Sequence, residues 1–159
     1  MLPGKLKVLF LCTGNSCRSQ MAEGWARQLK GDVIEAYSAG VEPHGMNALA
    51  VKAMAEAGVD ISGHKSKHVE TLAHIRFDYV VTVCGHAAET CPMFTGPTQV
   101  VHVGFDDPPA LAKHAATSEE ALAHYTRVRD EIRDWVGTLP ESLPKKAGQA
   151  SPSSSGSAR

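Results

Sequence analysis

The sequence lacks a long hydrophobic run and any marked excess of charge. Its longest apolar stretch near the N-terminus, within residues 6–11, is too short for a signal-peptide core and far too short to span a bilayer. The formal net charge of the 159 residues is −1, and no basic block precedes the C-terminal tail. We therefore expect neither a membrane nor a nucleic acid as a partner, and we expect the cytoplasm as the location.

Cysteine is also scarce, with only four residues in the chain. A chain of this length with 43% hydrophobic residues can bury a core of its own, so it needs no disulfide framework. Thiols stay free in a reducing compartment, and these cysteines are expected to be redox-active or catalytic rather than structural. We expect one domain over residues 1–139 and a disordered tail over residues 140–159, where Pro, Lys, Ser and Gly dominate.

The motif Cys-Thr-Gly-Asn-Ser-Cys-Arg-Ser occupies residues 12–19, between an apolar strand pattern and a helical pattern. A turn between a buried strand and a helix N-terminus presents free backbone amides and the positive end of the helix dipole, which together bind anions. Gly14 allows the loop to curl tightly, and Arg18 supplies a planar fork of donors that matches two oxygens of a tetrahedral oxyanion. The motif therefore predicts an oxyanion site.

Cys12 begins this motif, where the field of the helix and of Arg18 favours a thiolate that can act as a nucleophile. Asn15 and Ser19 have side chains short enough to hydrogen-bond the sulfur or the loop backbone. Taken alone, Cys12 is more typical of a buried cysteine beside a helix-capping serine. The presence of Gly14, Arg18 and Ser19 at these spacings favours the oxyanion and thiolate interpretation.

Apolar strand patterns alternate with helical patterns along the chain, which predicts an α/β fold built on a three-layer open sheet of four parallel strands with helices on both faces. The expected strands are residues 6–11, 33–39, 77–83 and 99–103. The expected helices are residues 19–30, 47–57, 69–75 and a last helix that begins with a capping box from Thr117 to Glu120. Glu23 is expected to be a solvated carboxylate, and residues 104–109 are expected to form a loop at the carboxyl end of the fourth strand.

Cys84 follows the third expected strand, and Cys91 lies in the segment beyond it. A helix between them would separate their Cα atoms by about 10.5 Å, whereas a disulfide needs about 4.4 to 6.8 Å. Bonding therefore requires the segment to unwind, which Gly85 and Pro92 make easier, and this is typical of a redox switch. Two alternatives stay open: inert core thiols, or zinc ligands together with His86, although no second close pair completes a four-ligand site. We expect no metal and no cofactor.

Several stretches resemble known families. The motif at residues 12–19 resembles the Cys-x5-Arg-Ser phosphate-binding loop of the low-molecular-weight protein tyrosine phosphatase fold. The segment at residues 81–92 closely resembles the redox segment of thioredoxin-coupled arsenate reductases, and Gln20, residues 104–108 and residues 127–132 match the same family. The resemblance covers residues 5–139 and is specific, because the three cysteines and the acidic loop occur together in the family's order.

This resemblance implies an arsenate-binding loop and a general acid. Cys12 would attack arsenate held by the loop amides and Arg18. The acid that protonates the departing oxygen would be Asp107, directly before Pro108, with Asp106 as the rival. Phosphate or sulfate could occupy the same loop. The implied oxyanion-binding residues are Thr13, Gly14, Asn15, Ser16, Cys17, Arg18 and Ser19.

The resemblance also implies a relay of disulfides that regenerates the nucleophile. Cys84 would attack the sulfur of Cys12, and arsenite would leave as a Cys12–Cys84 disulfide forms. Cys91 would then attack Cys84, giving a Cys84–Cys91 disulfide for thioredoxin to reduce. Cys17 is assigned no step, although it could form a side disulfide with Cys12 under oxidative stress. The expected activity is arsenic detoxification by a monomeric oxidoreductase.

Several members of this family bind potassium beside the loop, and the matching positions here are Asn15, Glu23 and Ser38. Where those members place an aspartate, this chain has Lys67, whose ammonium could occupy the cation position instead. We therefore expect no dependence on potassium.

Two other functions use the same residues. A phosphatase would use the loop and Asp107 through a cysteinyl-phosphate intermediate. Such phosphatases usually carry aromatic residues after the Asp-Pro pair, whereas Pro109 and Ala110 follow here. A non-catalytic oxyanion-binding module is the third alternative, and the intact Cys12 argues against it.

Overall fold

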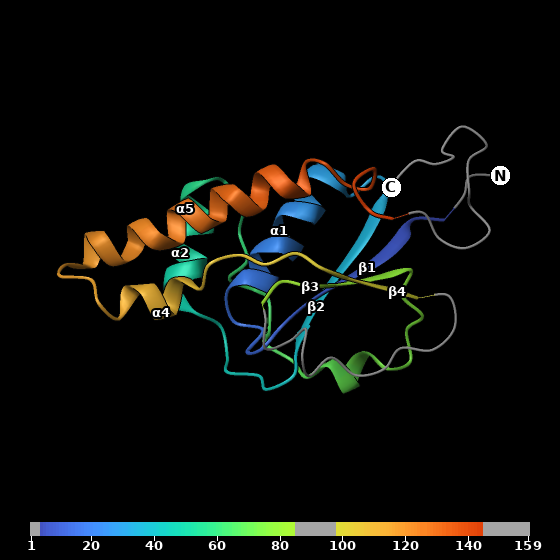
Figure 1. Ribbon diagram of the computed structural model, residues 1–159, viewed down its shortest axis with the longest axis horizontal. Coiled ribbons are helices and arrows are strands. Elements are labelled where there is room, and N and C mark those ends of the chain that lie inside the picture. The colour runs from blue at the N-terminus through green and yellow to red at the C-terminus, as the bar shows by residue number, and fades with distance from the viewer. Residues whose placement is uncertain (1–3, 85–97, 145–159) are drawn as a thin grey trace.

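The computed structural model describes residues 4–84 and 98–144. The elements are β1 (Leu6–Cys12), α1 (Arg18–Lys30), β2 (Ile34–Gly40), α2 (Ala48–Glu56), the 3-10 helix η1 (Val69–Leu72), β3 (Tyr79–Thr82), β4 (Gln99–His102), α4 (Pro108–Ala112) and α5 (Ser118–Val136). The four strands form one parallel sheet in the order β2-β1-β3-β4 (Figure 1). The open sheet of four parallel strands expected from the sequence is confirmed.

The two central strands, β1 and β3, are the most buried. The last five residues of β1 and all of β3 are buried, as continuous apolar runs predict for strands covered on both faces. Cys12 pairs with Gly40 of β2, and Leu11 pairs with Thr82 of β3, so the carboxyl ends of these strands lie at one edge of the sheet. The loops that follow β1 and β3 therefore meet at that edge.

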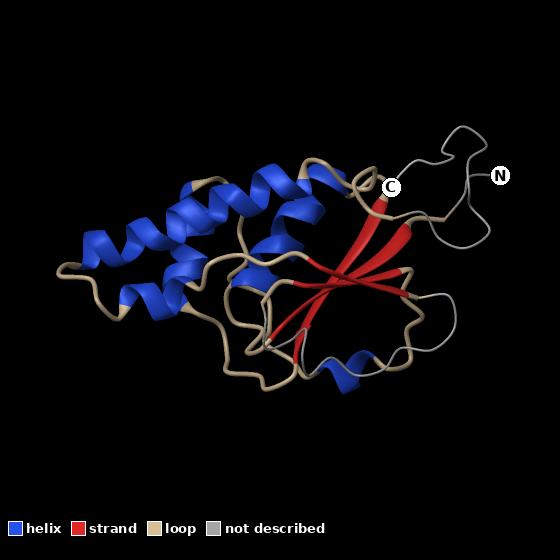
Figure 2. Ribbon diagram, viewed as in Figure 1, coloured by secondary structure: helices blue, strands red, loops and turns tan. Residues whose placement is uncertain are grey.

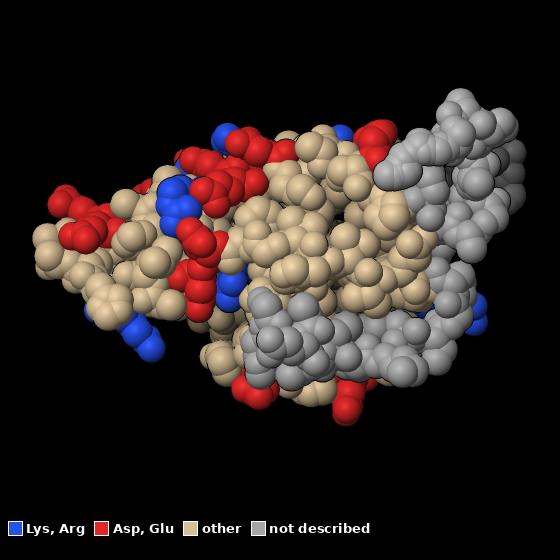
Figure 3. Space-filling model, in the orientation of Figure 1, with Lys and Arg blue, Asp and Glu red and all other residues tan. Residues whose placement is uncertain are grey.

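The helices lie on both sides of the sheet. Figure 2 shows α1 and α5 on one side and η1 on the other. Phe10 of β1 meets Trp135 of α5 edge to face, with ring centroids 6.2 Å apart. The buried residues of α5 include Tyr125, Val128 and Ile132, at the spacings of three and four that predict one apolar face. On the surface seen in Figure 3, acidic and basic side chains are interspersed along α5, which is the solvated side of this helix.

The start of α5 matches the sequence expectation in one of its two capping bonds, whereas α4 begins inside an expected loop. The Thr117 hydroxyl accepts a hydrogen bond from the Glu120 backbone N–H at 3.0 Å, as a capping box predicts, but the Glu120 carboxylate accepts from Ala116 rather than from Thr117. The expected loop over residues 104–109 already contains the start of α4, because Pro108 occupies the first helical turn after Asp107. Proline fits that position because its fixed φ is helical and a first-turn N–H has no intrahelical partner.

The chain continues in packed form past the domain boundary expected from the sequence. Leu139 and Leu143 are buried, and the Tyr79 hydroxyl donates a hydrogen bond to the Pro144 carbonyl at 2.5 Å. Residues 145–159 of the expected tail lie outside the described residues. Among the described helices, none has the length and apolar character needed to cross a membrane.

Candidate active site

The loop between β1 and α1 is held from behind by main-chain hydrogen bonds. The carbonyls of Cys12, Thr13, Gly14 and Ser16 accept from the backbone N–H groups of Val41, Glu42, His44 and Asn47, respectively, at 2.8 to 3.3 Å. The carbonyl and the N–H of one trans peptide point in opposite directions. The N–H groups that follow these carbonyls therefore face the opposite side of the loop, which is the arrangement an oxyanion requires.

Close approach of the chain explains two glycines in this region. A Cβ at Gly14 would lie 2.5 Å from Nδ1 of His44, and a Cβ at Gly40 would lie 2.7 Å from the Thr13 carbonyl oxygen. Asn15 adopts a positive φ of 49°, a conformation that asparagine tolerates better than most residues. The loop curls as the sequence predicts, and its side chains and its backing segment fix that shape.

Cys12 ends β1 with its sulfur directed at the start of α1. Its Sγ lies 2.9 Å from the Ser19 hydroxyl oxygen, and the Asn15 side-chain amide donates to that same oxygen at 2.9 Å. Because the Ser19 oxygen already accepts from Asn15, its own proton is free to be donated to the sulfur. The arrangement supplies a hydrogen-bond donor to the Cys12 sulfur and fixes the direction of its side chain.

Arg18 and Asp107 face each other across the same pocket. Nη1 of Arg18 donates to the Phe105 carbonyl at 2.8 Å, and Nη2 lies 3.4 Å from the Asp107 carboxylate. Both side chains line a pocket of about 490 Å³, together with loop residues, residues 44–47 and Pro109. Asp106 instead pairs with Arg127 of α5 at 3.0 Å, so of the two neighbouring acids it is Asp107 that faces the loop.

The second cysteine of the expected relay lies beside the first turn of the loop. The Cys84 sulfur is 3.2 Å from the Thr13 hydroxyl, and the Cys84 side chain is buried. Thr13 is the residue directly after Cys12, so Cys84 approaches the start of the loop from the β3 side of the pocket. Cys91 lies outside the described residues.

Cys17 is buried in the same loop, with 3% of its surface exposed. Burial raises the pKa of its thiol well above the ordinary value, with a further increase from the neighbouring Cys12 charge. Cys17 therefore stays a neutral thiol when a thiolate is present at Cys12.

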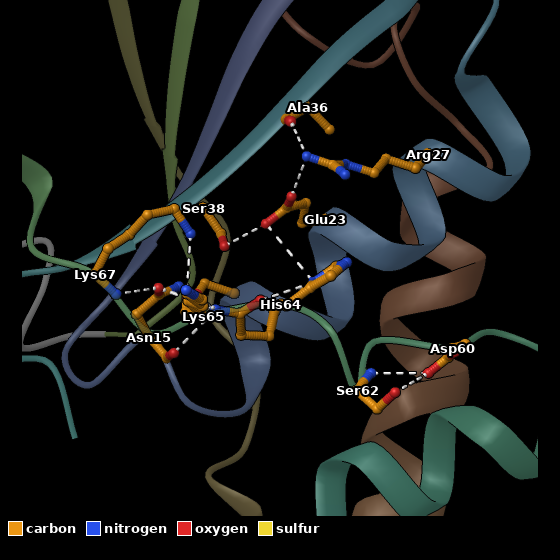
Figure 4. A network of polar contacts seen from close by, with 12 residues as sticks. Asn15, Glu23, Arg27, Ala36, Ser38, Asp60, Ser62, His64, Lys65 and Lys67 are labelled. Atoms are coloured by element: carbon orange, nitrogen blue, oxygen red, sulfur yellow. Dashed lines mark hydrogen bonds and ion pairs between the residues drawn. The ribbon is translucent and has the colours of Figure 1, made fainter. Parts of the chain in front are cut away.

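Glu23 is not the solvated carboxylate that the sequence suggested. It is buried at 4% exposure, accepts a hydrogen bond from Ser38 at 2.5 Å, and pairs with Arg27 at 2.5 Å (Figure 4). The expectation was wrong because Ser38 of β2, fifteen positions further along the chain, packs against this part of α1. Arg27 balances the charge that burial would otherwise penalise.

The same network extends to the oxyanion loop, residues 12–19. It also contains Lys67, the residue whose ammonium was expected to take the place of a potassium ion. The backbone N–H of Lys67 donates to Asn15 Oδ1 at 2.9 Å, and its ammonium donates to the Lys65 carbonyl at 3.0 Å. Burial lowers the pKa of Lys67 and also that of His64, whose Nδ1 lies 4.0 Å from the Glu23 carboxylate. Arg27 thus already pairs with the Glu23 carboxylate, and independence from potassium stays a prediction.

Gln20 supports the loop at residues 12–19, a part that sequence reasoning did not assign to it. Its side-chain amide donates to the Asn15 backbone carbonyl, to Asn15 Oδ1 and to the Lys65 carbonyl at 3.0 to 3.2 Å. Its Oε1 lies 2.9 Å from Nδ1 of His64. Its place directly after Ser19 was the available signal, but its three partners come from the loop and from residues 64–65, which the local pattern does not reveal.

A buried cysteine sulfur, a tightly curled loop, an arginine and a facing carboxylate are the groups that covalent chemistry on a tetrahedral oxyanion uses. The family profile described as "Low molecular weight phosphotyrosine protein phosphatase" matches residues 7–149. The chain belongs to this family.

Within the family, the chain is similar to curated proteins named arsenate reductase. It is 54% identical over 135 residues to one from Bacillus subtilis (strain 168), covering 85% of this chain and 95% of that protein. It is 51% identical over 138 residues to one from Halalkalibacterium halodurans, covering 87% and 97%.

Solved structures described as arsenate reductases are also similar to the chain. A structure described as an arsenate reductase in the phosphate binding state is 29% identical, with a TM-score of 0.66 over 87% of this chain and 99% of that one. Another, in the oxidized state, is 30% identical, with a TM-score of 0.69 over 84% and 95%.

Proposed function

We propose that the protein reduces arsenate to arsenite with its own cysteines as the electron source. The observation that carries the proposal is the position of Cys84, whose sulfur lies 3.2 Å from the hydroxyl of Thr13, the residue next to the nucleophile Cys12. A phosphatase needs one sulfur at such a loop, whereas a reductase needs a second sulfur close enough to attack the first. The relatives that are half identical to this chain are named arsenate reductases.

In the first step, the Cys12 thiolate attacks arsenic while the loop amides and Arg18 hold the other oxygens. One oxygen leaves as water with a proton from Asp107, and a covalent adduct between sulfur and arsenic(V) forms. The 3.4 Å contact between Arg18 and Asp107 keeps the acid at the mouth of the pocket that receives the anion. Arg18 thus contacts both the anion site and the acid.

In the second step, Cys84 attacks the Cys12 sulfur, and the electron pair of the bond between sulfur and arsenic passes to arsenic. Arsenite leaves, and the two sulfurs form a disulfide, so two electrons leave the thiols and two reach arsenic. The Thr13 hydroxyl at 3.2 Å is suited to donate a hydrogen bond to the attacking Cys84 thiolate.

The third step returns the site to its starting form. Cys91 attacks Cys84, which frees Cys12 and leaves a Cys84–Cys91 disulfide. Thioredoxin, with a potential of about −270 mV, is the proposed reductant of that disulfide. Such a cycle operates in a reducing compartment, which supports the expectation of a cytoplasmic protein.

Phosphate-ester hydrolysis is the second candidate, because the family, the loop and Asp107 serve it equally well. Phosphate and arsenate have nearly the same shape, so a weak phosphatase activity accompanies the proposed reductase. Pro109 follows Asp107 in the pocket lining. No Phe, Tyr or Trp is among the described residues that line the pocket, so none of them could stack on a phosphotyrosine ring.

One assay separates the two functions. Arsenite release is measured with thioredoxin, thioredoxin reductase and NADPH for the parent, Cys84→Ser and Cys91→Ser, and p-nitrophenyl phosphate hydrolysis is measured on the same three preparations. A reductase loses multiple-turnover arsenite release in both variants and keeps its weak phosphatase activity, which also shows that both variants fold. Undiminished arsenite release in Cys84→Ser contradicts the proposal.

A further inference from the structure

The segment at residues 41–47 supports the back of the oxyanion loop, and one of its residues also reaches two helices. The backbone N–H of Asn47 donates to the Ser16 carbonyl at 3.2 Å. Its side-chain oxygen accepts from the N–H groups of Leu49 and Ala50 at 2.9 and 3.1 Å, which caps α2. Its side-chain nitrogen donates to the Tyr125 hydroxyl oxygen at 3.0 Å. The two backbone donors to its oxygen fix which end of the amide faces Tyr125.

Tyr125 is a firm partner for this amide. Its side chain is 3% exposed on the core side of α5, so its ring has little freedom to move. Burial raises the pKa of the Tyr125 phenol, so the hydroxyl stays neutral. A second contact ties the same two helices together, because Arg129 Nη1 donates to the Ala53 carbonyl of α2 at 2.8 Å.

Helix α5, which contains Tyr125, also contacts the acidic loop at residues 104–107. Arg127, two positions after Tyr125 on α5, pairs with Asp106 at 3.0 Å, and Asp106 directly precedes Asp107. The oxyanion loop and the acidic loop are therefore both fastened to one stretch of α5, the first through Asn47 and Tyr125 and the second through Arg127.

We propose that Asn47 is a positioning residue, which through Tyr125 fixes the oxyanion loop to α5 and so sets its distance from the acidic loop. This inference deepens the proposed function, since it assumes that residues 12–19 bind the oxyanion. Asn47 acts through the Ser16 carbonyl, so its loss loosens the loop rather than removing a group that does chemistry.

The test measures the dissociation constant of inorganic phosphate by calorimetry for the parent and for Tyr125→Phe, which deletes only the accepting hydroxyl. Tyr79→Phe is the matched control, because Tyr79 is equally buried and its hydroxyl bonds the Pro144 carbonyl at the opposite end of β3. We expect Tyr125→Phe to weaken phosphate binding about threefold to tenfold, the effect of one hydrogen bond. Tyr79→Phe should leave phosphate binding unchanged, even where both variants lower the melting temperature alike.

A second variant isolates the link from the helix cap. Asn47→Ser keeps a capping oxygen for α2 but cannot reach Tyr125, and it should weaken phosphate binding as much as Tyr125→Phe does. The double variant should bind phosphate no more weakly than either single variant, because both delete the same bond. Equal affinity in the parent and Tyr125→Phe, equal weakening in Tyr79→Phe, or additive losses in the double variant would each overturn the inference.

Phosphate binding does not require the reduction of arsenate, so the positioning role and the proposed function can be tested independently. A parent that releases no arsenite contradicts the proposed function, while weakened phosphate binding in Tyr125→Phe would still support the positioning role. In the active enzyme, Tyr125→Phe should raise the KM for arsenate more than it lowers kcat, because Cys84 is not part of this link.

Discussion

The two loops that form the site differ in how they are held. In the oxyanion loop, Asn15 and Ser19 are fully buried, and Cys12 and Cys17 are nearly so. In the acidic loop, the side chains of Asp106 and Asp107 are 64% and 45% exposed. The first loop is held by hydrogen bonds from residues 41–47 and from Ser66 and Lys67. The second is held by contacts from the largely buried Arg18 and the exposed Arg127.

This difference matches the work we propose for each loop. A site that binds an oxyanion gains most when its donors are fixed before the anion arrives, because no reorganisation is then needed during the reaction. An acid must exchange its proton with water in every cycle, which an exposed carboxylate does readily. Arg18 connects the two loops, since it starts α1 and bonds the Phe105 carbonyl.

The sharpest test of this comparison exchanges each acid for its amide. Asp107→Asn should lower kcat for arsenite release by about a hundredfold or more, as loss of a general acid does. Phosphate affinity should not fall, because the oxyanion loop is untouched. Asp106→Asn is the neighbouring control and should lower kcat only severalfold through its contact with Arg127; the larger loss in Asp106→Asn would reverse the assignment.

The cysteines of the oxyanion loop should differ in reactivity. Burial raises the pKa of Cys17, so its thiolate is lost as the pH falls below that raised pKa, and iodoacetamide should leave it unmodified between pH 6 and 9. Both cysteines line the pocket, but the Ser19 hydroxyl contacts the Cys12 sulfur, and Cys12 should be alkylated at least about tenfold faster. Peptide mapping measures both rates, and phosphate should protect Cys12. Faster labelling of Cys17 would refute this description of the loop.

A substitution in the oxyanion loop should lower the stability of the protein more than a substitution at a contact of the acidic loop. Asn15→Ala removes buried hydrogen bonds to Ser19 and Gln20 and places alanine at a positive φ, so it should lower the free energy of unfolding by about 1 to 3 kcal/mol. Arg127→Ala removes exposed ion pairs and should cost less than about 1 kcal/mol. Urea unfolding of both variants measures the two losses in free energy of unfolding. Equal losses would contradict the difference between the two loops.

The smallest expected effect concerns potassium. Arg27 already pairs with Glu23, and the Lys67 backbone N–H bonds Asn15 Oδ1, so groups of the chain itself already engage two of the oxygens that a potassium ion would need. Replacing sodium with potassium at constant ionic strength should leave the rate of arsenite release unchanged. A clear rate increase would mean that this network binds the ion after all.

Local patterns were sufficient for much of the fold and for the chemistry of the loop. Apolar runs located all four strands, and the motif at residues 12–19 predicted a curled loop before a helix, with Ser19 near the Cys12 sulfur. These features are set by neighbours in the chain, through burial of whole strands and the spacing of short polar side chains.

Local sequence patterns did not show the contacts between distant segments. They made Glu23 a solvated carboxylate, although the family resemblance had already grouped Glu23 with Ser38 of another strand. The choice between Asp106 and Asp107 likewise depended on Arg127 of α5. The support of the loop by residues 41–47 is mainly main-chain bonding, to which side-chain identity gives little clue. The sequence could therefore identify candidate residues, but it could not show which of them contact one another.

The central claim is that the sulfur at Cys84 attacks the sulfur at Cys12, and Cys91→Ser tests it most directly. A single turnover of reduced Cys91→Ser with arsenate, quenched in acid and mapped by mass spectrometry, should yield one arsenite per chain and a peptide pair linked through Cys12 and Cys84. Arsenite release with both of these thiols still free, or a disulfide that joins Cys12 to Cys17 instead, would contradict the account.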